Sequence, residues 1–222
     1  MSFSDIKDCP FCLLHSKTLP DLPETLQVSG YEKLNQRLLY KGNNYNVKPD
    51  ISPITINHFL IIPHNHFFSF LTLPKDDLIE LELIKDKIKN FYKSKMGMNY
   101  LFFEHGSCKD SKGSSCIHHA HIHSIPINME EEKYIILQSL NKLGMPIKNI
   151  DELDKNNYLY LESSSSYPLF WNDKINTSQL FRIIISDILG VYKRSKWQNC
   201  ILDSIERLKS ESWLNESGLI DL

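Results

Sequence analysis

Three alternating histidines, His119, His121 and His123, are the residues of this sequence best suited to chemistry. Small or apolar residues separate them, and an apolar segment follows. Imidazole is nucleophilic when neutral and titrates near pH ~6.5, so a row of these rings can attack, bind or protonate a phosphate group. Histidine-rich tracts also occur as incidental metal-binding segments or exposed strand faces, and the spacing alone leaves that alternative open.

The two-residue period predicts a strand over His119–Ile127, because alternate side chains of a strand share one face. The imidazoles would then form a row on that face, with neighbouring Cα atoms about 6.5 Å apart. His118 interrupts the alternation and should point the other way. Two adjacent rings of the row can hold one phosphate, while the third serves a different site.

A second chemical motif, Cys9-Pro10-Phe11-Cys12, lies near the start of the sequence. A CxxC motif is either half of a zinc site or a redox pair. A redox pair usually opens a helix after a strand, and the segment before Cys9 is too short to hold that strand. The histidines elsewhere can complete a tetrahedral zinc site, which favours the metal interpretation.

The overall composition is that of a globular protein. The chain has 222 residues, 41% of them hydrophobic and 23% charged, which fits one large domain or a small domain with an extension. The net charge of −2 gives no strong nucleic-acid signal and no attraction to membranes. The five cysteines are an odd set, and neither a secretory signal nor a transmembrane run is visible. We therefore expect a cytoplasmic protein without a disulfide framework.

The clearest element is a helix over residues 74–96. Its apolar side chains recur at steps of three and four, and Asp76 and Asp77 follow Pro74 at the positive end. The other expected elements are short strands at 38–40 and 45–47, strands at 59–62 and 100–103, a helix at 129–143, a hairpin of 158–161 and 167–171, and helices at about 178–190 and 197–212.

Taken together, these segments resemble the histidine-triad (HIT) family. Its pattern, His-φ-His-φ-His-φ-φ with φ apolar, is matched from His119 onward except at the polar Ser124. The run from Asp50 to His66 resembles the family's Asp-Ile, strand and Pro-x-x-His sequence, and the CxxC motif resembles the zinc knuckle of its bacterial members. This resemblance covers about residues 9–127. A weaker match to the longer bacterial members extends through Glu104-His105-Gly106, Ser178, Gln179, Arg182 and Trp197.

The resemblance implies an α+β fold, with an antiparallel sheet of about five strands and the 74–96 helix packed on one face. It implies a HIT-like nucleotide-binding catalytic domain at residues 1–128 and a mixed C-terminal α/β extension at residues 129–222, packed on the same domain. Because family members usually pair, it also implies a homodimer.

The resemblance assigns the catalytic roles to the histidine row. His121 would attack the α-phosphorus of a nucleotide and form a nucleotidyl-histidine. His123 would hold a phosphate oxygen or help to protonate the leaving group. His119, the first member of the row, would complete the triad and also serve as a metal ligand. The implied zinc ligands are Cys9, Cys12, His66 and His119, a closed and therefore structural site.

The implied substrate-binding residues lie around the row. Asp50 would accept hydrogen bonds from the ribose hydroxyls, and Ile51 and Leu60 would flank the base. A turn-forming role for Asp50 before Ser52-Pro53 remains open. Ser114 and Ser115, with the loop amides, would cradle phosphate oxygens. Glu104 stands where the family often has a polar amide on the substrate, and Ser115 where it commonly has a glutamine.

The expected function is that of an enzyme, a nucleotide hydrolase or nucleotidyltransferase acting at the α-phosphate. Candidate substrates are dinucleoside polyphosphates such as diadenosine polyphosphates, nucleoside phosphoramidates and adenylylated small molecules. The alternative is a zinc-stabilised nucleotide-binding or interaction protein without turnover. The row of histidines favours the enzyme, whereas Glu104 and Ser115 favour altered specificity or lost activity.

Overall fold

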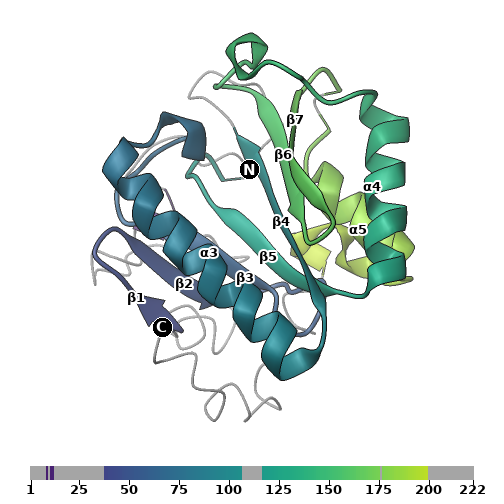
Figure 1. Cartoon of the computed structure of the whole chain (residues 1–222), viewed down its shortest axis with the longest axis horizontal. Helices are drawn as coiled ribbons and strands as arrows, with labels where there is room; N and C mark the ends of the chain where they lie inside the picture. The colour runs from purple at the N-terminus through teal and green to yellow at the C-terminus, as the bar shows by residue number, and fades with distance from the viewer. Residues whose placement is uncertain (1–8, 10, 13–37, 107–116, 176, 200–222) are drawn as a thin grey trace.

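A computed structural model of the chain describes residues 9, 11–12, 38–106, 117–175 and 177–199. Its centre is a seven-stranded antiparallel sheet with the strand order β1-β2-β3-β5-β4-β6-β7 (Figure 1). The strands are β1 (Tyr40–Lys41), β2 (Tyr45–Pro49), β3 (Phe59–Pro63), β4 (Asn99–Gly106), β5 (Ile122–Ile127), β6 (Tyr158–Ser163) and β7 (Ser166–Asn172). The α-helices of the described ranges are α3 (Lys75–Met96), α4 (Met129–Leu143) and α5 (Leu180–Ile188).

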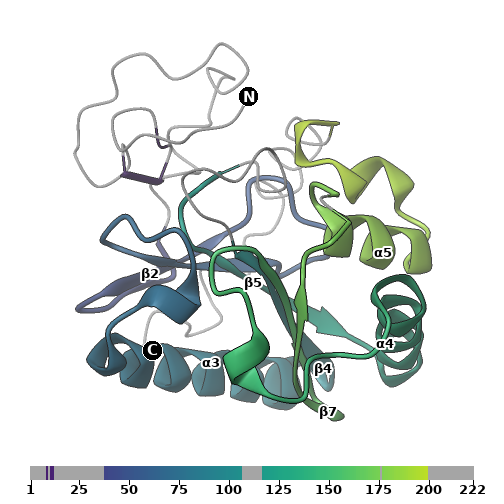
Figure 2. The same cartoon turned by 90° about the horizontal axis from the view of Figure 1, so that it is seen from above.

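Helices cover both faces of the sheet (Figures 1 and 2). Helix α3 packs on one face, where its buried side chains join those of β2, β3 and the even-numbered positions of β4 and β6. Helices α4 and α5 pack on the opposite face against the odd-numbered positions of β4, β5 and β6. The alternation along each strand therefore divides the core into two apolar layers.

The α3 helix confirms the expectation for residues 74–96, and its boundaries follow from local signals. Pro74 occupies the N-cap, so the helix begins one residue later than expected, and Asp76 and Asp77 lie in its first turn. Gly97 ends the helix with φ at 65°, a left-handed conformation that glycine adopts without a Cβ penalty.

The α4 helix confirms the expected 129–143 segment. The Asn128 side chain accepts a hydrogen bond from the backbone N–H of Glu131, and the Glu131 carboxylate accepts one from the backbone N–H of Asn128. This reciprocal capping box satisfies two amide groups that a helix start would otherwise leave unpaired. The backbone N–H of Gly144 closes the other end by donating to Leu140.

The expected α+β fold with an antiparallel sheet and a packing helix is confirmed, but the sheet is larger than about five strands. The expected hairpin forms β6 and β7, and β6 pairs with β4 from Leu101↔Ser163 to Gly106↔Tyr158. The β6–β7 hairpin, which belongs to the C-terminal part of the chain, therefore extends the same sheet that contains His123.

The expected strand over His119–Ile127 is wrong for its first residues, because β5 begins only at Ile122. The backbone N–H of Ala120 donates to Phe67 at 2.6 Å, outside the sheet ladder. Only His123 of the histidine row therefore lies on the strand, and the three rings do not line one strand face.

In the C-terminal part, α5 confirms the helix expected at 178–190, with shorter bounds. The helix expected at 197–212 lies outside the described residues beyond a 3₁₀ turn at Trp197–Asn199. In the described ranges we find no helix whose length and apolar character would let it cross a membrane.

Candidate active site and metal centre

The ring of His121 is oriented by a backbone carbonyl. Its Nδ1 lies 2.7 Å from the carbonyl oxygen of His119, and only a protonated Nδ1 can donate to that acceptor. A neutral His121 therefore keeps the lone pair on Nε2. Burial lowers the pKa of His121 to about 3, and the nearby His123 acts in the same direction. The ring is thus a neutral imidazole with a defined nucleophilic nitrogen.

His123 lies beside His121, on the face of the sheet that α5 covers. The two ring centroids are 5.0 Å apart. The His123 ring stacks on Phe103 of β4, with centroids 4.6 Å apart and planes 7° from parallel. Phe103 in turn contacts Phe181 of α5. The apolar packing between sheet and helix therefore sets the orientation of His123.

A buried polar network lies behind His123. His123 Nδ1 is 2.8 Å from His58 Nε2, and His58 Nε2 is 3.3 Å from Asp50 Oδ2. The guanidinium of Arg182 donates from Nη1 to the same Asp50 oxygen at 3.0 Å. Asp50 Oδ1 accepts from the backbone of Ser52 at 2.8 Å. Asp50 Oδ2 also lies 3.6 Å from His123 Nδ1, so Arg182 of α5 is linked to the histidine row through the hydrogen bonds of Asp50 and His58.

The charges of this network follow from its burial. Burial by itself raises the pKa of Asp50, but the neighbouring His58 ring and the Arg182 guanidinium outweigh it and hold that pKa well below its usual range. Burial lowers the pKa of His58 well below its usual value and also lowers the pKa of His123, although Asp50 opposes both shifts. The resting network is an ionised Asp50–Arg182 pair beside two neutral rings.

Asp50, His58 and His123 also have the spacing of a metal site, with one donor atom from each within 4.8 Å of the others. The Arg182 guanidinium lies 3.0 Å from the carboxylate oxygen that would bind the cation. The two ring nitrogens are joined directly at 2.8 Å. A positive charge and a direct hydrogen bond favour proton bonding over metal binding here.

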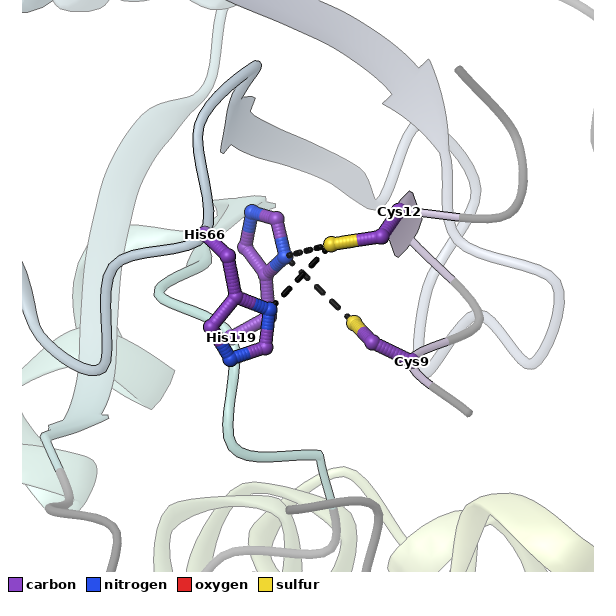
Figure 3. A group of neighbouring side chains, drawn as sticks. All are labelled: Cys9, Cys12, His66 and His119. Atoms are coloured by element: carbon purple, nitrogen blue, oxygen red, sulfur yellow. Dashed lines mark hydrogen bonds between the residues drawn. The ribbon is translucent and has the colours of Figure 1, made fainter. Parts of the chain in front are cut away.

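The residues expected to bind zinc do come together. Two imidazoles and two thiols, those of His66, His119, Cys9 and Cys12, converge on one point (Figure 3). Cys9 Sγ lies 3.4 Å and Cys12 Sγ 3.5 Å from His119 Nδ1, and Cys12 Sγ lies 3.2 Å from His66 Nδ1. Tetrahedral zinc with normal bond lengths requires sulfur–nitrogen separations of about 3.6 Å.

The protonation of the ligands fits a metal as well. His119 Nε2 lies 2.9 Å from the carbonyl of Pro63, so Nε2 carries the proton and Nδ1 offers its lone pair to the thiols. A hydrogen bond between the two thiols lowers the pKa of Cys9 to about 4 and raises that of Cys12. The donor set and its spacing are compatible with structural zinc.

Phe11, between the two cysteines, connects the metal centre with the nucleophilic ring. Its ring meets His119 edge-on at 5.6 Å and His121 at 5.4 Å between centroids. Cys9 and Phe11 are buried with Leu60 and Ile62 of β3. The knuckle therefore packs on the strand beside the histidine row.

Glu104, one of the expected substrate-binding residues, is not brought together with the histidines. Glu104 follows Phe103 on β4 and therefore points to the opposite face, where Tyr158 donates a hydrogen bond to it and the backbone of Phe70 donates another at 3.1 Å. Ile51 lies half-buried in the bend after β2. Ser114 and Ser115 lie outside the described residues.

The buried Glu104 gives a prediction about stability. Burial raises its pKa from 4.5 to about 8, against the effect of its two hydrogen bonds. Between these values the folded chain holds a proton that the unfolded chain has released, so the free energy of unfolding falls as pH rises through this window. Glu104→Gln has no proton to lose. We expect its stability relative to wild type to improve by on the order of 3 kcal/mol from pH ~5 to pH ~9.

Urea unfolding of wild type and Glu104→Gln at a series of pH values measures this difference. Tyr158→Phe is the matched control, because it removes a hydrogen-bond donor and keeps the ionisable carboxyl group. Parallel pH profiles for wild type and Glu104→Gln would show that Glu104 titrates normally.

Sequence reasoning assigned no role to His58 or Arg182. His58 was visible only as the residue before an apolar strand. Arg182 could have been noticed in the sequence, because it is the one cation in the apolar segment Leu180–Ile185. In the structure its side chain is buried, with 4% exposed. Its partner Asp50 lies 132 residues away in the chain, so the pattern does not reveal the pair.

Comparison with known proteins gives one family match. Residues 2–139 match the family model described as "Protein similar to CwfJ C-terminal". A curated relative from Oryza sativa subsp. japonica, "Zinc finger CCCH domain-containing protein 59", is 24% identical over 223 residues. That alignment covers 90% of this chain but 32% of the relative, so the chain spans about a third of that protein's length.

Two solved structures with a similar arrangement are histidine-triad proteins by name. A zinc-bound histidine triad family protein from Mycobacterium smegmatis is 20% identical, with a TM-score of 0.39 over 56% of this chain and 78% of that one. A hypothetical histidine triad nucleotide-binding protein from Sulfolobus tokodaii strain7 is 17% identical, with a TM-score of 0.39 over 92% and 96% of the two chains.

Proposed function

The chain belongs to the family of proteins similar to the CwfJ C-terminal region, and we propose that it is a nucleotide hydrolase or nucleotidyltransferase acting at the α-phosphate. The observation that carries the proposal is the hydrogen bond of 2.7 Å between His121 Nδ1 and the His119 carbonyl. It leaves Nε2 as the free nucleophile of a neutral ring. Nucleophilic catalysis requires this combination of protonation and orientation.

The proposed reaction has two steps. His121 Nε2 forms a bond to the α-phosphorus while the bond to the leaving oxygen breaks, and the leaving group departs with the electron pair. The positive charge that develops on the ring is stabilised through Nδ1–H by the carbonyl of His119. Water or another acceptor then forms a bond to the same phosphorus while the P–Nε2 bond breaks. The acceptor's proton passes to solvent, the nucleotide is released, and Nε2 regains its lone pair in a neutral ring. His123 donates a hydrogen bond to a phosphate oxygen in both steps.

Zinc would be held by Cys9, Cys12, His66 and His119, and its contribution would be structural. With all four positions taken by protein side chains, the ion has no open position for a substrate. We propose that this centre keeps Phe11 against His121 and the knuckle against β3.

A second candidate function is nucleotide binding without turnover. Asp50, which the resemblance assigns to the ribose hydroxyls, is 4% exposed and already bonded to Arg182 and to the backbone of Ser52. A thermal-shift screen of mononucleotides and dinucleoside polyphosphates, followed by chromatography of the products, separates the two. Released monophosphate supports the enzyme, whereas a raised Tm without products supports the binding protein.

The homodimer implied by the resemblance stays a prediction, and the sheet edges argue against edge pairing. Strand β7 contains Pro168, which has no N–H to donate, and a register shift lies opposite it on β6. The other edge strand, β1, has only two residues, Tyr40 and Lys41. Light scattering at micromolar concentration is expected to give twice the chain mass through another surface. A monomer mass would rule the dimer out.

A further inference from the structure

One hydrogen bond determines where the protons lie on two histidines. The backbone N–H of Ile54 donates to His58 Nδ1 at 3.0 Å. Since that nitrogen accepts, the neutral His58 ring carries its proton on Nε2. His58 Nε2 lies 2.8 Å from His123 Nδ1, which must therefore be the acceptor. A neutral His123 consequently carries its own proton on Nε2, the ring nitrogen not engaged by His58.

Asp50 and Arg182 hold His58 in this arrangement. The His58 Nε2–H also faces Asp50 Oδ2 at 3.3 Å, and Arg182 Nη1 donates to that oxygen at 3.0 Å. Arg182 Nη2 donates to the carbonyl of Ser52 at 2.6 Å, which fixes the loop that carries Asp50. The side chains of His58, Asp50 and Arg182 are 0%, 6% and 4% exposed, so water does not replace these bonds.

We propose that Asp50 and Arg182 are positioning residues, which act through His58 to keep His123 as a hydrogen-bond donor from Nε2 to the substrate phosphate. The inference rests on the proposed α-phosphate chemistry for its catalytic consequence. For Asp50 it replaces the ribose-binding role that the family resemblance implies. For Arg182 it means that α5, in the C-terminal part of the chain, completes the site.

The ribose and positioning roles of Asp50 predict different kinetics. Asp50→Asn places an amide N–H toward two donors, Arg182 and His58. His58 is then no longer held in place, and the proton of His123 is no longer confined to Nε2. We expect kcat to fall by roughly 100-fold, the usual loss for one oriented donor. The factor should be equal for diadenosine tetraphosphate and for its analogue lacking the 2′ and 3′ hydroxyls. A ribose ligand would instead raise KM for the ribose substrate alone, and the variant would no longer distinguish the two substrates.

Arg182 is tested with a matched neighbour. Arg182→Met should lower kcat with little change in KM. Arg182→Lys should lower kcat less than Arg182→Met does, because its ammonium group can still reach Asp50. Arg194→Met is the control, since Arg194 Nη1 also donates to this loop, at the carbonyl of Pro53 2.7 Å away, and not to Asp50. It should keep the wild-type kcat. Equal losses in Arg194→Met and Arg182→Met would assign both effects to loop stability and overturn the proposal.

Histidine ¹⁵N chemical shifts in the resting 222-residue chain test the same inference without a nucleotide. His123→Gln assigns the resonances of His123 by their loss. Wild type should show a protonated Nε2 and an unprotonated Nδ1, and Arg182→Met a mixture of tautomers. A protonated Nδ1 in wild type, or an unchanged tautomer in Arg182→Met, would overturn the positioning role. Absence of turnover with every nucleotide would contradict the proposed function instead, and the tautomers would still decide this inference.

Discussion

Replacement of His121 by alanine is expected to lower turnover of a dinucleoside polyphosphate by roughly 10³- to 10⁶-fold, because the reaction loses its nucleophile. The other two histidines of the row cannot substitute for it. The Nδ1 of His123 is bonded to His58, and the Nδ1 of His119 faces the two thiols. The loss should appear in kcat, since the phosphate contacts of the ground state remain.

Two controls make this result specific. Imidazole added to His121→Ala should restore part of the rate, because the truncated side chain leaves space for a free ring with the same chemistry. His64→Gln changes a histidine bonded to Asn46 on β2 and should keep the wild-type rate. Turnover of His121→Ala within tenfold of wild type would mean that another group attacks the phosphorus.

The second large effect concerns the metal centre. We expect one zinc per chain in untagged protein, and Cys9→Ser should lose it, because the variant lacks one of two thiolate ligands. Structural zinc contributes directly to folding free energy, so the Tm should fall by roughly 10 °C for a chain of this size. Cys9 is fully buried with Phe11, and its loss also releases the ring that contacts His121. Activity should therefore fall together with zinc content.

Elemental analysis and thermal unfolding of the same samples measure both quantities. Cys200→Ser is the control, because Cys200 belongs to no proposed ligand set, and it should retain zinc and Tm. Wild-type protein without zinc, or Cys9→Ser with unchanged zinc content and Tm, would contradict a metal bound by this cluster.

The helices were predictable because their signals are local. The positions of Pro74 and Gly97 bound α3, and the Asn128–Glu131 capping box starts α4 within four residues of sequence. The individual strands of the β6–β7 hairpin were equally visible. The pairing of β6 with β4 was not visible, since it depends on contacts between Leu101–Gly106 and Tyr158–Ser163, far apart in the chain.

The histidine row shows why a local pattern can mislead. Its alternation predicts one strand face, but long-range bonds remove its first part from the sheet. His119 Nε2 bonds Pro63 at a separation of 56 residues, and Ala120 bonds Phe67. These contacts direct His119 to the cysteines and leave His121 beside His123. The residue types were informative about chemistry, whereas the backbone path depended on tertiary contacts.

In the candidate site, too, the residue types were predictable from the sequence, whereas positions that depend on tertiary contacts were not. Cys9, Cys12, His66 and His119 were predicted as one set, and the structure brings one donor atom of each within 4.8 Å of the others. Glu104 was expected near the substrate, but the alternation of β4 turns it toward Tyr158. That outcome depends on which face of β4 meets the histidines, and a single strand of mostly apolar residues does not reveal it.

We expect His121 to become covalently nucleotidylated during turnover. The most direct measurement mixes the protein with a nucleotide that carries a good leaving group, quenches in base and maps the adduct by mass spectrometry, because a phosphoramidate of histidine survives base. We predict a nucleoside monophosphate on the ring of His121 in the wild-type protein and no such adduct in His121→Ala. An adduct on Ser114 or Ser115, or product formation without any adduct in rapid-quench samples, would contradict it.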